Sequence, residues 1–360
     1  MRRRPALTAI AAVAATVLLG AHPGPPPQAF DSVQRTLAGR FGLTAAERNT
    51  LTGGFEAVRA LPSANDDGVA AIGAIWIDAR PDVYLRWAED FADFDRGSSV
   101  QAVQKLSSPP VLSDFNTLRL SVEELRDLSR CRVGACALQL DADSIRQVAA
   151  IDWRRQDANE RATDVVRRFM FDVARRYIAG GNAGLPHYHD AKKATDVEGN
   201  LAGLLDDERA AGRTPAPLVA FLREYPRAPL PPQSTAYLYW TTNTFGLKPT
   251  TRLNHTVVYR GPADDQVIGI IATKQLYASH YFHGALEMRY VIANPALDDR
   301  FALVMVTRTR SDGLTGVTGA VIGGTVRRRA LSSLRAYLRF TREMVQKRQR
   351  GGWTGNATGG

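Results

Sequence analysis

The sequence predicts an α+β fold, an antiparallel sheet followed by a long C-terminal helix, with a large helical insertion. Three observations support this class. Five strand-like segments rich in Val, Ile, Thr and aromatic residues follow one another over residues 235–310, separated by short turns. Residues 326–346 carry apolar side chains at helical spacing, and the region from about residue 121 to 225 is mostly helical in pattern. The five strands are expected over residues 235–245, 252–259, 267–277, 284–292 and 300–310.

The N-terminus is typical of an export signal. Three arginines after Met1 precede an apolar run of 15 residues, which ends at Gly20 and is followed by a proline-rich stretch. A membrane-spanning helix needs about 20 apolar residues, so the run is short for an anchor. We therefore expect residues 1–22 to be a signal peptide and the protein to be exported, either periplasmic or secreted. An uncleaved N-terminal membrane anchor is the alternative.

Residues 23–54 are expected to contain a linker and two short helices. The first helix spans residues 29–42, where apolar residues repeat at helical spacing. Thr44, with Glu47 three residues later, predicts a capping box at the start of the second.

Residues 55–120 are expected to form the first part of the α+β domain. A strand over residues 69–79 runs into a helix that starts at Pro81, because proline is favoured in the first helical turn. A further strand is expected over residues 100–106.

Residues 121–232 are expected to form the helical insertion. Its strongest helix covers residues 160–178, preceded by a short strand over 137–140 and by a helix capped by Asp143. Shorter helices are expected over residues 121–128, 195–208 and 217–222. The buried stripe of the strongest helix is expected to contain Ala162, Val166, Phe169, Val173 and Tyr177.

Residues 233–350 are expected to hold the sheet and the C-terminal helix, with a glycine-rich loop over 313–324 and a disordered tail over 351–360. The net charge of the chain is +10, and residues 308–350, with eleven basic and two acidic side chains, contribute +9 of it. A basic helix can bind an anionic membrane surface, whereas an ordinary solvated helix face is the other interpretation. The candidate membrane-binding residues are Arg327, Arg328, Arg335 and Arg342.

The two cysteines, Cys131 and Cys136, are expected to pair. Close cysteines in an exported protein usually form a disulfide, and Gly134 between them allows a tight turn. Free buried thiols, and redox or metal chemistry, are the alternatives. The spacing does not match a Cys-x-x-Cys motif, and no second cysteine pair is present to complete a zinc site.

The order of elements resembles the START-like, or helix-grip, superfamily. Residues 71–84 look like the first strand of such folds running into its helix, and residues 235–310 followed by 326–346 look like the remaining sheet and the closing helix. The resemblance covers under half of the mature chain. It implies a curved sheet that wraps the terminal helix, a cavity between the two, and a hydrophobic or lipid-like ligand. The insertion is unusually large for that family, which leaves open one elaborated domain or two.

Aromatic and polar residues of the predicted sheet are the candidates for contacting such a ligand. The turn after residue 277 crowds histidines and aromatics together, and Glu287 alternates with aliphatic residues along the next strand. We expect this turn to border the main pocket beside the terminal helix. Each histidine has a structural alternative as a hydrogen-bonded core residue. The ligand-binding candidates are Trp76, Trp240, Asn243, His255, Tyr277, His280, Tyr281, His283, Glu287 and Arg308.

Three functions remain open from the sequence. The first is an exported protein that binds a hydrophobic or amphipathic small molecule. The second is an enzyme that uses a histidine with Glu287 as an acid–base pair in the same cavity. The third is a protein that docks on a membrane or partner through its basic helix. We expect no cofactor and no nucleic-acid partner. His187 and His189, followed by Asp190, offer too few ligands for us to predict a metal site.

No motif in the sequence specifies a reaction. The Gly-x-Ser-x-Gly elbow, the P-loop, the dinucleotide fingerprint and the His-Glu-x-x-His motif are all missing. Hydrophobic residues make up 44% and charged residues 23% of the chain, which excludes wholesale disorder and a coiled coil.

Overall fold

The computed structural model describes most of the chain between the expected signal peptide and the tail. The expected signal peptide and residues 353–360 of the expected tail lie outside the described residues. Side chains are described from Phe30 onward and, in the last helix, from Gly324 onward. The described ranges are residues 27–62, 68–91, 94, 99–244, 248–261, 266–293, 297–311 and 316–352.

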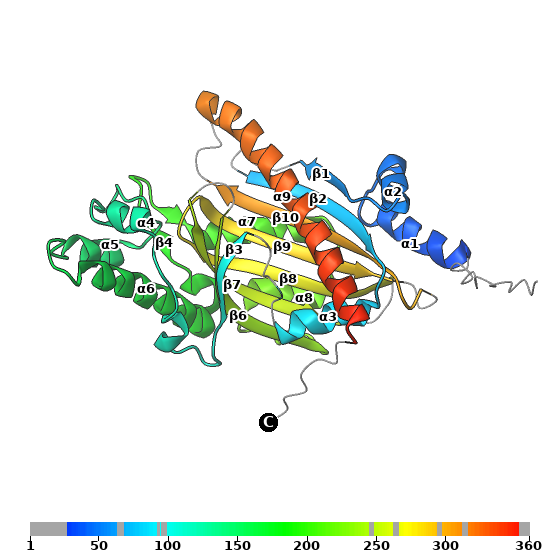
Figure 1. Cartoon of the computed structure of the whole chain (residues 1–360), viewed down its shortest axis with the longest axis horizontal. Coiled ribbons are helices and arrows are strands. Elements are labelled where there is room, and N and C mark those ends of the chain that lie inside the picture. The colour runs from blue at the N-terminus through cyan, green and yellow to red at the C-terminus, as the bar shows by residue number, and fades with distance from the viewer. Residues whose placement is uncertain are drawn as a thin grey trace, which may run out of the picture.

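The centre of the molecule is one eight-stranded antiparallel sheet (Figure 1). Its strand order is β1-β2-β10-β9-β8-β7-β6-β3, so the chain returns to the first strands only at its end. The five strands expected over residues 235–310 are all present. The strands are β1 (Ala57–Leu61), β2 (Gly68–Ile77), β3 (Val100–Lys105), β6 (Ser234–Asn243), β7 (Thr250–Tyr259), β8 (Val267–Ala278), β9 (Phe282–Ile292) and β10 (Phe301–Ser311).

Helices cover the sheet on both faces. They are α1 (Pro27–Gly39), α2 (Ala45–Thr52), α3 (Pro81–Asp90), α4 (Val122–Leu128), α5 (Ala142–Ala149), α6 (Ala158–Gly180), α7 (Val197–Ala210), α8 (Ala216–Glu224) and α9 (Gly316–Arg350). A 3₁₀ turn, η1 (Leu112–Phe115), precedes the insertion. A second, η2 (Gly181–Gly184), and a small ladder of β4 (His187–Tyr188) with β5 (Thr195–Asp196) complete it. No helix in the described part of the chain is long and apolar enough to span a membrane.

The long helix α9 crosses one face of the sheet, which we call the cavity face (Figure 1). Strand alternation sends Ile75, Leu303 and Met305 to this face, where they join one hydrophobic cluster with Leu334 and Leu338 of α9 and with α3. Gly73 of β2 permits the close approach, because a Cβ there would lie 2.7 Å from Leu338 Cδ1. The α+β class and the closing helix are therefore confirmed.

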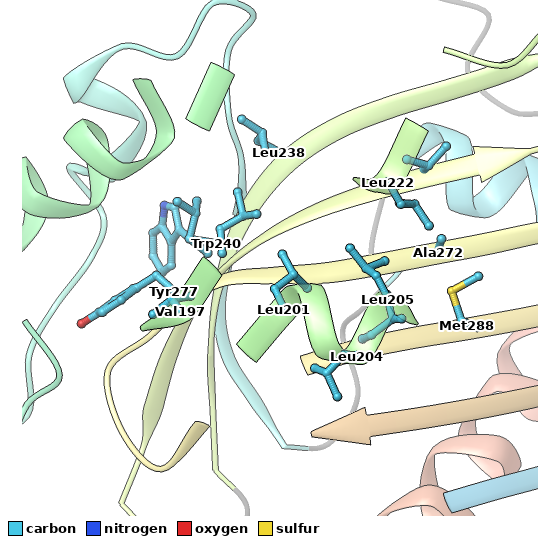
Figure 2. Packing of buried hydrophobic residues seen from close by; sticks show 14 of the residues in the cluster. Val197, Leu201, Leu204, Leu205, Leu222, Leu238, Trp240, Ala272, Tyr277 and Met288 are labelled. Carbon is cyan, nitrogen blue, oxygen red and sulfur yellow. The ribbon is translucent and has the colours of Figure 1, made fainter. Parts of the chain in front are cut away.

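The opposite face, which we call the insertion face, carries a larger core. Leu201, Leu204 and Leu205 of α7 and Leu222 of α8 lie over strands β8 and β9 (Figure 2). All five residues of the stripe expected on α6 are buried in the same cluster. The insertion therefore shares one continuous hydrophobic core with the sheet.

Several local expectations need correction. Residues 137–140 form no strand, because their backbone bonds run to two separate segments: Gln139 N donates to Ser279 O and His189 N to Leu140 O. The next helix is capped by Asp141, whose Oδ1 accepts from Ser144 N at 2.8 Å, rather than by Asp143. The expected capping box of Thr44 and Glu47 is confirmed.

The glycine-rich loop expected over residues 313–324 is largely helical. Helix α9 already begins at Gly316, and residues 312–315 lie outside the described part. Each glycine in a helix costs only about 1 kcal/mol relative to alanine, and Val, Thr, Ala and Ile residues separate these glycines. Glycine content alone therefore does not end the helix.

The disulfide expected from the sequence is present. Cys131 and Cys136 are joined with an S–S distance of 2.08 Å. Gly134 between them has a φ of +81°, which glycine adopts without strain, and Arg132 pairs with Ala135 across the turn. The bond closes a tight loop between α4 and the segment that leads to α5.

Candidate functional site

A cavity of about 350 Å³ lies between the cavity face of the sheet and α9. Its wall on the helix side is mostly apolar, whereas its floor on the sheet is mostly polar. The principal wall residues are Met305, Ala330, Leu334, Tyr337 and Phe340. The principal floor residues are Thr241, Asn243, Arg252, Glu287, Arg289 and Thr307.

The polar floor is an ordered network centred on Glu287. Arg289 Nη2 donates to Glu287 Oε2 at 2.9 Å, and Arg252 Nη1 lies 3.6 Å from Glu287 Oε1. Asn243 Oδ1 accepts from Thr241 Oγ1 at 3.1 Å and from Arg252 Nη2 at 3.4 Å. Alternation along β9 places residues 287 and 289 on the same face, so both reach the cavity.

Arg289 is the most deeply buried charge of the floor. Its side chain is 2% exposed, and its guanidinium carbon lies 5.3 Å from the centre of the Phe94 ring and 5.1 Å from that of Tyr337. Two aromatic faces and one carboxylate offset the cost of burying this cation. Arg289 thereby joins the sheet floor to α9, which supplies Tyr337.

Two of the ten candidates from the sequence, Asn243 and Glu287, line the cavity. Trp76, Trp240 and Tyr277 lie in the core of the insertion face instead. Trp76 stacks on Phe30 with ring centres 5.6 Å apart, and Trp240 Nε1 donates to Asp114 O at 2.9 Å. The structure therefore does not bring these tryptophans to the cavity, because strand alternation points them to the other face.

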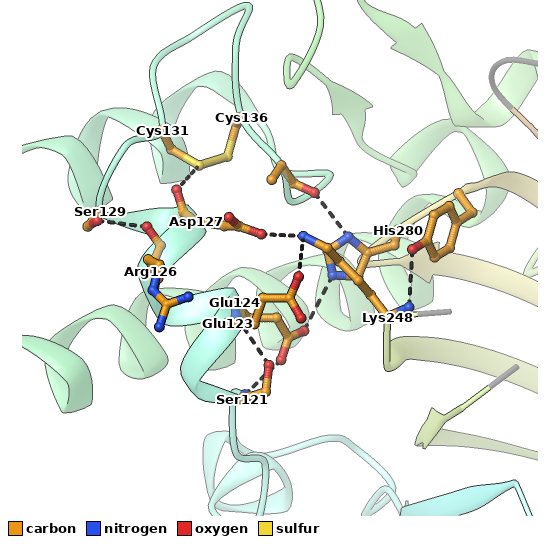
Figure 3. Close-up of polar contacts among 12 residues, drawn as sticks. Ser121, Glu123, Glu124, Arg126, Asp127, Ser129, Cys131, Cys136, Lys248 and His280 are labelled. Atoms are coloured by element: carbon orange, nitrogen blue, oxygen red, sulfur yellow. Dashed lines mark hydrogen bonds and ion pairs between the residues drawn. A yellow bond between two sulfur atoms is a disulfide. The ribbon is translucent and has the colours of Figure 1, made fainter. Parts of the chain in front are cut away.

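The turn between β8 and β9 lies against helix α4 of the insertion (Figure 3). His280 Nδ1 lies 3.0 Å from Ala137 O, and its Nε2 lies 3.5 Å from Glu124 Oε1; both side chains are 4% exposed. Tyr281 Oη accepts from Lys248 N at 3.2 Å. The expectation that this turn borders the main cavity is thus corrected for His280 and Tyr281.

The remaining histidine and arginine candidates also lie outside the cavity lining. His283 is buried near the start of β9, but it is not among the described residues that line the cavity. Arg308 Nε lies 3.6 Å from Glu208 Oε2, under α7 on the insertion face. With His255 on that face too, no described histidine lines the cavity beside Glu287, so the expected acid–base pair is not assembled there.

Sequence reasoning missed a buried lysine behind the cavity floor. Lys274 is fully buried on the insertion face, where its Nζ donates to Leu222 O at 2.7 Å and to Asn182 Oδ1 at 2.9 Å. It also lies 4.9 Å from the centre of the Tyr177 ring. Burial lowers the pKa of Lys274 to about 7, while the oxygens and the ring favour its charged form. The sequence signal that could have identified this residue is a single lysine within a mostly apolar strand.

His255 belongs to the same cluster. Its Nδ1 lies 2.6 Å from Tyr177 Oη, and burial, assisted by the charge of Lys274, holds the pKa of His255 well below its ordinary value. Burial likewise raises the pKa of Tyr177 well above its ordinary value. The imidazole is therefore neutral and hydrogen-bonded within the core, as the structural alternative for this histidine predicted.

The basic face of α9 is partly engaged within the chain. Arg342 Nη1 donates to Gly54 O at 2.8 Å, and Arg335 Nη2 to Val58 O at 3.4 Å. These contacts fasten α9 to β1 and the loop before it. Membrane binding through this helix stays a prediction, and two of its four candidate arginines have contacts to the protein's own backbone.

No group of three or more His, Cys, Asp or Glu side chains is arranged to hold a metal ion within the described residues. His187 is exposed on β4, and His189 Nδ1 lies 3.1 Å from His187 O. Their neighbour Tyr188 points into the core and accepts a bond from Ala278 N.

No protein-family model and no curated protein matches the sequence. Among solved structures, a START superfamily protein from Mycobacterium smegmatis is 14% identical, with a TM-score of 0.23, and the match covers 31% of this chain and 65% of that chain. An aromatase/cyclase from a Streptomyces species is 12% identical, with a TM-score of 0.24, and the match covers 34% and 79%.

These scores are too low to carry an argument, and the chain spans less than two thirds of the mycobacterial protein. The START-like resemblance is visible instead in the topology. Strand β2 runs into α3, strands β3 and β6–β10 continue the same sheet, and α9 closes over it, with β1 added at the edge beside β2.

Proposed function

We propose that the protein binds a compact amphipathic small molecule in the cavity between the sheet and α9. The observation that carries this proposal is the division of the cavity into an apolar helix wall and a networked polar floor. Ligand sites in proteins typically combine an apolar lining with a few placed polar groups. The apolar body of the ligand would lie against Tyr337 and Phe340, with its polar end over Asn243 and Glu287.

The volume supports a small ligand rather than a long-chain lipid. About 350 Å³ falls at the lower end of the range of about 300–1,000 Å³ that is usual for ligand pockets. The apolar wall still favours a hydrophobic body, because contact with it removes apolar surface from water.

A cavity-filling variant tests the proposal directly. Ala330 lines the cavity from α9, so Ala330→Trp would place an indole in the space that the ligand needs. Wild type and variant are purified under native conditions, extracted with organic solvent, and the extracts are compared by mass spectrometry. We expect a recurrent small amphipathic compound from the wild type and its loss from Ala330→Trp.

Ser332→Trp is the matched control, because Ser332 is exposed on the same helix and is not among the described lining residues. It should retain the compound. Equal recovery from Ala330→Trp and Ser332→Trp, with both variants folded, would contradict binding in this cavity.

We further infer that the mature protein acts outside the cytoplasmic membrane. The arginine-rich start, the short apolar run and the following prolines support this inference. N-terminal sequencing of the exported protein should find that the first 20 to 30 residues are missing. A chain that begins at Met1 and stays with the membrane fraction would favour the anchor.

A further inference from the structure

We infer that Asn254 and Gln275 form an uncharged polar subsite at the base of the cavity, and that the ligand brings a hydroxyl group to it. The inference rests on the proposed function and specifies the polar group of the ligand in the same cavity. Asn254 belongs to β7 and Gln275 to β8, and the two residues are register partners in the sheet. Each of them is 1% exposed.

Both side chains lie on the cavity face of the sheet. The residues on either side of Gln275, which are Lys274 and Leu276, belong to the insertion face, and so does Leu253 beside Asn254. Successive side chains of a strand point to opposite faces of the sheet. Asn254 and Gln275 therefore face the same side as the cavity floor.

Gln275 lies beneath a contact between two charged residues of the floor. In the register of the sheet, Arg252 is opposite Ala278 of β8, and Glu287 is opposite Thr273 of β8. The 3.6 Å contact between Arg252 Nη1 and Glu287 Oε1 therefore crosses β8 between these two positions, which lie on either side of Gln275. The two amides thus form a layer under the charged floor.

The two amides contribute three buried polar atoms that have no hydrogen-bond partner among the described residues. These atoms are Asn254 Nδ2, Gln275 Nε2 and Gln275 Oε1. Thr256 and Thr273, the next register partners on this face, do pair, with their hydroxyl oxygens 2.8 Å apart. Because a buried polar atom without a partner is unfavourable, three such atoms side by side indicate a place that another molecule completes.

A hydroxyl group matches these three atoms. It has one proton to donate and two lone pairs that accept, and the subsite offers one acceptor and two donors. An ionised carboxylate has no proton to donate to Gln275 Oε1, and an ammonium group has no lone pair to accept from the two nitrogens. The amides therefore favour an alcohol or a phenol over a charged ligand.

The floor can admit this group while its charged residues keep other partners. Arg289 Nη2 donates to Glu287 Oε2 at 2.9 Å, and Arg252 Nη2 donates to Asn243 Oδ1 at 3.4 Å. A hydroxyl that enters between Arg252 and Glu287 separates their 3.6 Å contact and leaves both of these bonds in place. The path from the cavity to Gln275 therefore runs between these two side chains.

Two probes separate the hydroxyl from the aromatic body. 2-Naphthol and 2-methylnaphthalene share one ring system and are close in shape, but only the first carries a hydroxyl. Their affinities for wild type and for Ala330→Trp are measured by equilibrium dialysis, with melting temperatures recorded to confirm that each protein is folded. We expect wild type to bind both probes and Ala330→Trp to bind neither.

Subsite variants should then move the two probes differently. Gln275→Met keeps the length of the side chain and removes both polar atoms, so it should weaken 2-naphthol about tenfold and leave 2-methylnaphthalene within about twofold. Its melting temperature should stay the same or rise, because an unpartnered amide leaves the interior. Asn254→Leu should act in the same direction, and it tests the subsite independently if Gln275→Met does not fold.

Gln147→Met is the matched control, because Gln147 is exposed on α5, away from the cavity lining. It should change the affinity of neither probe.

The outcomes distinguish this inference from the proposed function. If Ala330→Trp loses both probes but the subsite variants bind 2-naphthol as wild type does, the cavity binds ligands and the hydroxyl subsite is wrong. A lower melting temperature of Gln275→Met with unchanged 2-naphthol affinity would assign the amides to a structural water, which also overturns the inference. If 2-naphthol binds Ala330→Trp as well as wild type, the subsite is not in this cavity. If neither probe binds wild type, both the inference and the proposed function are contradicted.

Discussion

The two faces of the sheet differ in what surrounds their polar side chains. On the insertion face, Lys274 has two oxygen acceptors and an aromatic ring, and His255 shares a hydrogen bond with Tyr177, so the protein itself surrounds these groups. On the cavity face, Arg252 and Glu287 border an open volume and remain partly exposed. The insertion face is a packed core, whereas the cavity face borders the volume in which we propose that a small molecule binds.

Because of this difference, burial alone does not show whether a titratable group belongs to a binding site. Tyr177, His255 and Lys274, which are buried on the insertion face behind the cavity floor, have strongly perturbed pKa values. Their role is to satisfy one another within the core. Of the charged groups on the cavity floor, Arg252 and Glu287 are less buried than this core cluster.

The largest expected effect is on the free energy of unfolding, because the two faces of the sheet differ in how tightly they are packed. Leu286 is fully buried on the insertion face, so Leu286→Ala should lower the free energy of unfolding by about 2–5 kcal/mol. Met305 borders the cavity and already lacks packing partners on one side, so Met305→Ala should cost about 2 kcal/mol or less. Denaturant unfolding of both variants checks this, and an equal large loss would contradict an open cavity.

The next effect concerns Lys274 and pH. Its pKa falls from 10.5 to about 7 on folding, so the unfolded chain binds more protons between these values. Stability should therefore rise with pH from about 7 to about 10, by at most about 1.4 kcal/mol per pH unit for one group. Unfolding measured across this range should lose that slope in Lys274→Met. A slope that persists in the variant would assign the effect to another group.

A smaller effect tests the approach of α9 to the sheet. A Cβ at Gly73 would lie 2.7 Å from Leu338 Cδ1 and 3.1 Å from Leu334 Cδ2, so Gly73→Ala should destabilise the protein by about 1–3 kcal/mol. Gly203 on α7 has open space, its nearest neighbour being Arg310 Nη2 at 3.8 Å, and Gly203→Ala should stabilise it by about 0.5–1 kcal/mol. Opposite signs in thermal unfolding support this packing, whereas a neutral Gly73→Ala would contradict it.

The smallest effect concerns the basic helix. Arg342→Gln removes one partly exposed bond to Gly54 O and should cost no more than about 1 kcal/mol. The matched variant Arg327→Gln, at an exposed position, should leave stability unchanged. A larger loss of stability in Arg342→Gln than in Arg327→Gln would show that the hydrogen bond to Gly54 O helps to hold the exposed end of α9 in place.

The secondary structure was largely readable from local patterns. Alternation along the strands between residues 235 and 310 and the apolar stripe on α6 each show which residues share one face. The START-like order of elements predicted the closing helix. The errors fell where local sequence competes with long-range bonding, as at residues 137–140, whose backbone bonds run to residues 279 and 189. The glycines of residues 313–324 led to the wrong prediction of a loop, because the residues between them continue a helix, α9.

The site was only partly predictable, because a strand pattern shows which residues share a face but not which face is open. Glu287 and Asn243 were found, yet Trp240 and Tyr277 were assigned to the cavity although the insertion covers their face. No local pattern reveals that the helices of an insertion return to cover one side of the sheet. Arg252 was missed because its partners, Asn243 and Glu287, come from other strands.

The central claim is that a ligand occupies the space between the sheet and α9. A crystal structure of the wild-type protein soaked with N-phenyl-1-naphthylamine tests it most directly. We expect density for the probe against Tyr337 and Phe340, above the floor formed by Thr241 and Arg252. Density only on the insertion face or at the surface, or an empty cavity at saturating probe, would contradict it.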